Sequence, residues 1–100
     1  MIPTTEVIRY QVEDGQEEAF QAAYRQAGIL LERSPDCDGF QVLRGVEEPR
    51  RFLVLIRWRS VERHLEGFRK SADFAAFFAL VKPFFGAIEE MKHYQTDPAE

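Results

Sequence analysis

The chain has 100 residues, of which 45% are hydrophobic and 30% charged, and its formal net charge is −4. This balance is typical of a globular protein, and the length suits one domain with a single core. Acidic and basic residues are interspersed, which indicates no basic surface for nucleic acid, and no apolar run is long enough to span a membrane. We therefore expect a single domain over residues 1–100 with a core of about 5–95, located in the cytoplasm and without nucleic-acid or membrane partners.

The first third of the chain predicts a strand followed by a helix. Residues 5–12 alternate, with Ile8, Tyr10 and Val12 on one side, as in a half-buried strand. Asp14 and Glu17 have the spacing of a capping box, which predicts that a helix begins there. Apolar residues then recur at helical spacing until Ser34-Pro35, where we expect the helix to end.

The rest of the chain predicts two more strands, a broken helix and a last strand. Residues 39–47 and 51–58 are the expected strands, joined by a turn at 48–50. Ser60 is a candidate N-cap for a helix to about Lys70, and a second helix is expected from Ser71 to near Pro83. Residues 87–95 form the last strand. The order βαββαβ predicts an α+β, ferredoxin-like fold in which helices cover one face of an antiparallel four-stranded sheet.

The third strand predicts a partner for the sheet. Phe52, Val54, Ile56 and Trp58 point to one side, but Leu53 and Leu55 point to the other. Since the chain has no further element to cover the second face, we expect a homodimer in which two sheets pack face to face into a dimeric α+β barrel.

Aromatic residues are concentrated between residues 58 and 85. This segment holds six of the nine phenylalanines, the single tryptophan Trp58, and His64. His64 falls on the same helical stripe as Val61, Leu65 and Phe68. Two interpretations remain open: a plain aromatic core with a satisfied histidine, or a water-poor ligand cavity with His64 as its polar group. The six phenylalanines expected to wall such a cavity are Phe68, Phe74, Phe77, Phe78, Phe84 and Phe85.

The other reactive side chains define no second site. Cys37 is the only cysteine, so it forms no internal disulfide, and we expect it to be a small core residue. His93 lies in the last predicted strand, and His64 and His93 are candidates for neighbours across the fold. Two histidines without carboxylates at a fixed spacing do not define a metal site, so no metal is expected.

Several motifs resemble the antibiotic biosynthesis monooxygenase (ABM) domain family. They are SPDCDGF (34–40), RWRS (57–60), ERHLEGFRKSADF (62–74), KPFF (82–85) and KHYQ (92–95), and the likeness covers residues 6–95. Its most specific part is the group Trp58, Ser60, Glu62 and His64. The resemblance implies a dimeric α+β barrel with a cavity near Trp58 in each subunit.

The resemblance also bears on cofactors. Haem-degrading members pair the strand tryptophan with a first-strand asparagine and a helix histidine, and these two positions fall at about Ile8 and at Phe78 here. We therefore expect haem binding to be weak and to lack a histidine axial ligand. Cofactor-free members have an asparagine shortly before the tryptophan, where this chain has Val54 and Leu55.

The resulting functional hypothesis is a monooxygenase that oxidises a small phenol- or quinol-like aromatic without a cofactor. Such a substrate reduces oxygen itself once deprotonated, so the protein must bind it, exclude water and accept a proton. His64 is the expected base and Trp58 its catalytic neighbour, with the following side chains expected to bind or orient the substrate: Phe68, Phe74, Phe78, Phe85, Tyr10, Arg69, His93 and Tyr94. The alternatives are a non-catalytic binding module for an apolar aromatic or haem-like ligand, and an interaction protein whose phenylalanines pack a dimer.

Overall fold

A four-stranded antiparallel sheet organises the chain. The computed structural model describes residues 2–97. Its strands are β1 (Thr4–Gln11), β2 (Cys37–Arg44), β3 (Arg51–Trp58) and β4 (Ile88–Tyr94), in the order β2-β3-β1-β4. β1 and β3 occupy the centre, where alternate residues are buried and half-exposed, as the sequence pattern predicts.

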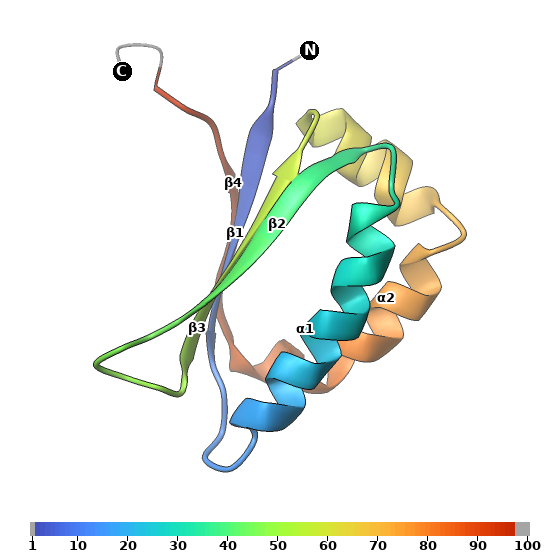
Figure 1. Ribbon diagram of the computed structural model, residues 1–100. Coiled ribbons are helices and arrows are strands. Elements are labelled where there is room, and N and C mark those ends of the chain that lie inside the picture. The colour runs from blue at the N-terminus through green and yellow to red at the C-terminus, as the bar shows by residue number, and fades with distance from the viewer. Residues whose placement is uncertain (1, 98–100) are drawn as a thin grey trace.

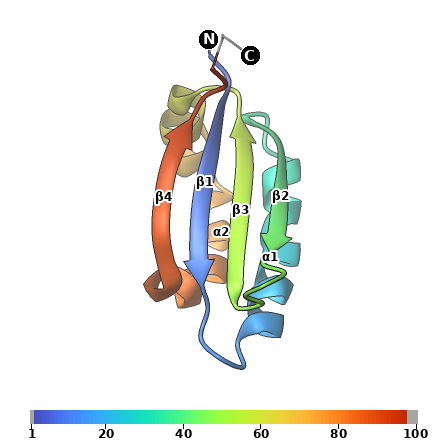
Figure 2. The same ribbon diagram turned by 90° about the vertical axis from the view of Figure 1, so that its left-hand side faces the viewer.

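The helical elements all lie on one face of this sheet. They are α1 (Glu17–Glu32), the π-helical turn η1 (Arg63–Gly67), the 3₁₀ turns η2 (Phe68–Lys70) and η3 (Lys82–Ala87), and α2 (Phe74–Val81). They form a single layer beside the sheet (Figure 1). Figure 2 looks at the opposite face, where all four strands are in front and the helices behind. The predicted α+β ferredoxin-like fold with a broken second helix is confirmed, and the sheet of this chain is open rather than closed.

The third strand has the two-faced character expected of it. Phe52, Val54, Ile56 and Trp58 are buried beneath the helices. Leu53 and Leu55 are half-buried on the open face, where Leu55 is opposite Val7 and Leu53 is opposite Leu43. Leu43 is 44% exposed, so the open face presents an apolar centre to its surroundings. Sheet-to-sheet dimerisation remains a prediction.

The start of α1 differs from the expected capping box. The helix begins at Glu17 with Gln16 as its N-cap, and no side chain caps it. Asp14 and Gly15 belong to a preceding turn in which the backbone N–H of Gln16 donates to the Glu13 carbonyl at 3.0 Å. Gly15 has φ of 88°, a conformation that residues with a side chain disfavour, so a glycine favours a turn at this point. Asp14 belongs to that turn and therefore does not cap the helix.

Other element boundaries moved by a few residues. β3 spans 51–58 as predicted, β2 begins earlier at Cys37 and ends at Arg44, and β4 runs over 88–94 rather than 87–95. The second helix begins at Phe74 rather than Ser71, because Ser71 is held in a turn by a bond from its hydroxyl to the Phe68 carbonyl. Cys37 is buried at 9% exposure, as expected for a packed thiol. Among residues 2–97, no helix combines the length and apolar character needed to cross a membrane.

Candidate functional site

A cavity of about 170 Å³ lies between the sheet and the second group of helices. Its walls are mostly apolar, with side chains from β1, β3, β4, α1, η1, η2, α2 and η3. Five phenylalanines contribute to it: Phe68, Phe74, Phe77, Phe78 and Phe85. Six side chains with polar atoms also line it: Glu6, Tyr10, Tyr24, Trp58, His64 and Arg69. A small apolar space with a few convergent polar groups is the usual form of a small-molecule site.

The phenylalanines form a continuous network of ring contacts. Phe68 meets Phe74 and Phe77 edge to face, with ring centroids 5.9 and 5.2 Å apart. Phe78 contacts Phe85 in the same way at 5.1 Å, and Phe85 is 41% exposed at the edge of the cavity. Edge-to-face rings cannot fill space as interlocking aliphatic chains do, which is consistent with a gap among them.

Phe84 is an exception to the predicted wall of six phenylalanines. It does not line the cavity, and its ring instead packs edge to face on Phe20 of α1 at 5.3 Å. Phe84 and Phe85 are adjacent in the 3₁₀ turn η3, so their side chains point in different directions. Phe84 is therefore part of the packing between η3 and α1.

A buried carboxylate at the cavity is the residue that sequence reasoning missed. Glu6 is 4% exposed and lies two residues before Ile8 on the apolar face of β1. Its Oε1 accepts a hydrogen bond of 3.1 Å from Nε1 of Trp58. Burying a carboxyl group with one neutral donor costs free energy, and such groups cluster at functional sites. The detectable signal was an acidic residue in phase with Ile8 and Tyr10.

His64 connects this carboxylate to a second histidine. Its Nε2 lies 3.6 Å from Oε1 of Glu6, and its Nδ1 is 2.7 Å from Nε2 of His93. The imidazole also stacks on the Trp58 indole, with centroids 4.3 Å apart and planes 7° apart. One face of Trp58 is thus occupied by His64, and its N–H is bonded to Glu6. Trp58 positions these two residues rather than presenting that face to a ligand.

The environment shifts the pKa values of these groups in opposite directions. Burial raises the pKa of Glu6 above its usual 4.5, although the bond from Trp58 and the charge of Arg69 oppose this. Burial, followed by the charges of Arg69 and His93, lowers the pKa of His64 to about 3. Burial and Arg69 also lower the pKa of His93. Because His64 stays neutral at physiological pH, it is a weak base on its own.

Two tyrosines meet at another part of the cavity. The hydroxyls of Tyr10 from β1 and Tyr24 from α1 are 2.6 Å apart, and both side chains are almost fully buried. Burial raises the pKa of Tyr10 to about 12 and that of Tyr24 well above its usual value. Both phenols therefore keep their protons and act as hydrogen-bonding groups. Tyr10 was among the predicted site residues, whereas Tyr24 was not.

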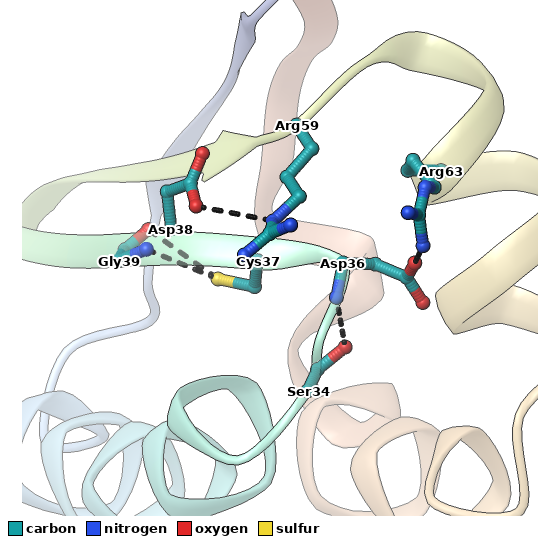
Figure 3. A network of polar contacts seen from close by, with 7 residues as sticks. All are labelled: Ser34, Asp36, Cys37, Asp38, Gly39, Arg59 and Arg63. Carbon is teal, nitrogen blue, oxygen red and sulfur yellow. Dashed lines mark hydrogen bonds and ion pairs between the residues drawn. The ribbon is translucent and has the colours of Figure 1, made fainter.

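A polar network fixes the turn that carries His64, and Figure 3 shows its contact between Asp36 and Arg63. Asp36, just before β2, accepts a bond of 2.8 Å from Arg63 of η1. The Ser60 hydroxyl accepts from the backbone N–H of Arg63 at 3.1 Å, which confirms the predicted N-cap. Gly67 lies against the Asp36 carboxylate so closely that a Cβ there would approach it to 2.6 Å. The motif SPDCDGF and the glycine of η1 thus position His64 relative to the sheet.

The structure places the remaining predicted residues as follows. Phe68, Phe74, Phe78, Tyr10 and Arg69 line the cavity. His93 does not line it and lies behind His64, which it contacts through the 2.7 Å bond. Tyr94 is 48% exposed, its hydroxyl bonds to Glu90, and it does not line the cavity, so the structure gives no support to an orienting role for Tyr94.

The residues that line the cavity include few side chains that could ligate a metal ion or a haem iron. Within residues 2–97, no three His, Cys, Asp or Glu side chains gather in a form that holds a metal ion. Phe78, at the position that the resemblance assigns to a haem ligand, presents a phenyl ring to the cavity. Val54 is fully buried in the core and Leu55 lies on the open face, so neither supplies a polar group here.

These features describe a class: a ferredoxin-like α+β protein with a small aromatic cavity between an open sheet and its helices. A sequence model of the antibiotic biosynthesis monooxygenase family matches residues 3–80. The chain belongs to the antibiotic biosynthesis monooxygenase family, as its motifs indicated.

Individual relatives agree with this assignment. An antibiotic biosynthesis monooxygenase structure from Bordetella bronchiseptica is 31% identical with a TM-score of 0.83, covering 97% of this chain and 99% of that one. The protein YczJ of Bacillus subtilis is 28% identical over 90% of this chain and 95% of its own length. SnoaB of Streptomyces nogalater, a cofactor-independent oxygenase, is 16% identical with a TM-score of 0.73, covering 98% and 99%. At that identity, the likeness to SnoaB shows the fold alone.

Proposed function

We propose that the protein is a cofactor-independent monooxygenase that oxidises a small phenol- or quinol-like aromatic in the cavity beside Trp58. The observation that carries this proposal is the buried carboxylate of Glu6 in an otherwise aromatic cavity. A phenol reacts with oxygen far more readily after it loses its proton. A desolvated carboxylate with a raised pKa is a stronger base than an exposed one.

The size of the cavity favours a single ring. Its volume of about 170 Å³ is close to the roughly 150 Å³ of an engineered apolar cavity that binds benzene. Two or three fused rings, or a haem, would need the phenylalanine wall to move. Phe74 and Phe78 are half-buried, and they would contact the faces of a bound ring while excluding water.

The proton path follows from two contacts of His64, which lies 3.6 Å from Glu6 and is hydrogen-bonded to His93. Glu6 accepts the phenolic proton, and His64 takes it from Glu6 at Nε2 while releasing another from Nδ1 to His93. The neutral imidazole both accepts and donates, so no imidazolium accumulates, in keeping with the lowered pKa of His64. His93 is half-buried and carries the proton outward. The expected role of His64 as base becomes that of a relay.

The oxidation itself requires only substrate and oxygen. The phenolate transfers an electron to O₂, and the resulting radical pair combines at a ring carbon to form a peroxide. Loss of water from the peroxide leaves a carbonyl. A phenol with a free ortho C–H thus gives an ortho-quinone and one water, with one atom of O₂ in each product. Arg69, at the cavity, would stabilise the negative charge that develops on substrate and oxygen.

A homodimer through the open sheet face is part of the same proposal. Val7, Leu43, Leu53 and Leu55 form an apolar centre there, surrounded by charged side chains such as Arg9 and Arg57. A second copy of the same face would bury this centre symmetrically. The dimer would also make the central strands rigid, and these strands carry Glu6 and Trp58.

Oxygen uptake tests the activity. Purified protein is supplied with phenols and quinols of one, two and three rings, and the rate is compared with that of the uncatalysed reaction. We expect uptake with single-ring substrates and a decline with each added ring. Tight binding of the single-ring compounds without any uptake would instead identify the rival function, a non-catalytic binding module.

A further inference from the structure

We infer that the Tyr10–Tyr24 hydroxyl pair is a second hydrogen-bonding site of the cavity, which binds an oxygen at the end of the substrate remote from Glu6. This inference rests on the proposed function for the identity of the reacting end. It adds that the preferred ligand is a single ring with oxygen substituents at opposite ends, as in a para-quinol or a 4-hydroxyphenyl carbonyl compound.

Hydrogen-bond accounting is the first argument. Two hydroxyls 2.6 Å apart share one hydrogen bond, in which one donates and the other accepts. The accepting hydroxyl still has its own proton, and no side chain or carbonyl among residues 2–97 takes it. A buried donor without an acceptor costs free energy, so this proton needs a partner from outside the protein. Both tyrosines line the cavity, which is where such a partner can be placed.

The spacing along β1 is the second argument. Glu6 and Tyr10 are four residues apart on the same face of the strand, which corresponds to about 13 Å between their backbone positions. A cavity of about 170 Å³ that these groups line has room for one six-membered ring and its two substituents. Between these ends the walls are apolar, with Ile8 on the sheet and Phe77 and Val81 on α2. The cavity therefore has two polar ends and an aromatic middle.

The protonation states fit this role. The tyrosines remain protonated throughout the physiological range, because burial raises the pKa of Tyr10 to about 12 and that of Tyr24 well above normal. They can donate to a carbonyl or hydroxyl oxygen but do not compete with Glu6 for the substrate proton. The two ends are thus chemically distinct, which would orient an unsymmetrical ligand in one direction.

Ligand binding without oxygen tests the site independently of turnover. Quenching of Trp58, the only tryptophan, reports binding of hydroquinone, 4-methylphenol and catechol under anaerobic conditions. We expect hydroquinone to bind about two- to tenfold more tightly than 4-methylphenol, the gain from one neutral hydrogen bond, and more tightly than catechol. In the double variant Tyr10→Phe/Tyr24→Phe this preference should disappear. Removing both hydroxyls together leaves no unpaired polar group, so the variant should fold.

Tyr94→Phe is the matched control, because Tyr94 lies outside the cavity and should leave the preference unchanged. Equal binding of hydroquinone and 4-methylphenol by the wild type would overturn the inference, as would an unchanged preference in the folded double variant. Oxygen uptake measured beside these titrations separates the two proposals. A hydroquinone preference without uptake would reject the oxygenase and keep the site, whereas uptake without the preference would do the reverse.

Discussion

The two faces of the sheet are built from the same strands but differ in what their polar residues do. On the open face, Arg9 pairs with Glu90 at 2.8 Å, where solvent and salt weaken the interaction. On the helix-covered face, Glu6 accepts from the neutral donor Trp58 and lies beside a neutral imidazole, and the charge of Arg69 does not overcome the effect of burial. Burial raises the pKa of Glu6, while hydrogen bonds from Tyr94 and Arg9 lower that of Glu90.

This contrast indicates which carboxylate is available for chemistry. Glu90 is stabilised as an anion by its partners, so it has little tendency to take a proton. Glu6 is held in an apolar space where the anion is poorly stabilised, and it therefore binds a proton more readily. The open face in turn carries the apolar centre through which we propose that two copies pair. The following predictions test this contrast.

Glu6→Gln should reduce the oxygen-uptake rate by roughly 10²–10⁴-fold, the range typical for loss of a general base. The amide oxygen still accepts from Trp58, so the fold should survive, as a thermal melt would report. Glu90→Gln on the open face is the matched control and should retain full activity. Wild-type rates in a folded Glu6→Gln variant would eliminate Glu6 as the base.

Leu53→Asp should abolish the dimer, because it buries an unpaired charge in the sheet-to-sheet interface at a cost of several kcal/mol by order of magnitude. Light scattering at micromolar concentration measures the association state. Leu43→Asp tests the same interface at a position that is 44% exposed in the single chain, and Ile29→Asp, on a helix surface that is 60% exposed, should leave the dimer intact. A monomeric wild type would contradict the predicted dimer.

The stability of the fold should decrease below pH 6.5 because of His64. Unfolded His64 binds a proton below its ordinary pKa of 6.5, whereas the folded residue remains neutral down to about pH 3. The unfolded state therefore binds more protons in this window, and the free energy of unfolding falls by up to about 1.4 kcal/mol per pH unit as pH decreases. Glu6 acts in the opposite direction above pH 4.5, since its folded pKa is raised.

Denaturant titrations of the wild type and His64→Gln between pH 4 and 7 isolate the histidine contribution. The variant should have a flatter pH dependence because it keeps Glu6 but lacks the titrating ring. If both proteins lose stability at the same rate per pH unit, His64 does not titrate as its burial implies.

Haem should bind weakly and without a histidine axial ligand. Phe78 occupies the position matched to the haem ligand, and the two histidines are bonded to each other. Haemin titration, followed at the Soret band, measures this. A tight complex with a histidine-ligated spectrum that disappears in His64→Ala or His93→Ala would show that the cavity opens and that the pair separates.

Much of the fold was predictable because the pattern of β3 depends only on local alternation, and its bounds of 51–58 were correct. The prediction of a capping box at Asp14 was wrong, because Gly15 favours a turn at the same residues. The sequence pattern also did not predict that the turn at His64 is π-helical. Its geometry depends on the tertiary contacts of Arg63 and Gly67 with Asp36.

The candidate site was predicted in its aromatic part and missed in its acidic part. Phenylalanines at helical spacing indicate a buried face whether or not a cavity forms. The positions of Phe68 and Phe78 on the inner side of the helices could therefore be predicted from the sequence. Glu6 lies near the start of β1, acidic residues are ordinarily exposed, and only the three-dimensional contact with Trp58 establishes its burial. The contact between His64 and His93 joins residues 29 positions apart and likewise needed the fold.

Oxygen-isotope labelling tests the proposed monooxygenase chemistry most directly. A single-ring phenol with a free ortho position, such as hydroquinone, is turned over in ¹⁸O₂, and the product is analysed by mass spectrometry in wild type and in Glu6→Gln. We predict a quinone with one ¹⁸O atom, formed by the wild type and strongly reduced in the variant. An unlabelled quinone, or labelled product formed equally by the folded Glu6→Gln variant, would contradict oxygen insertion initiated at Glu6.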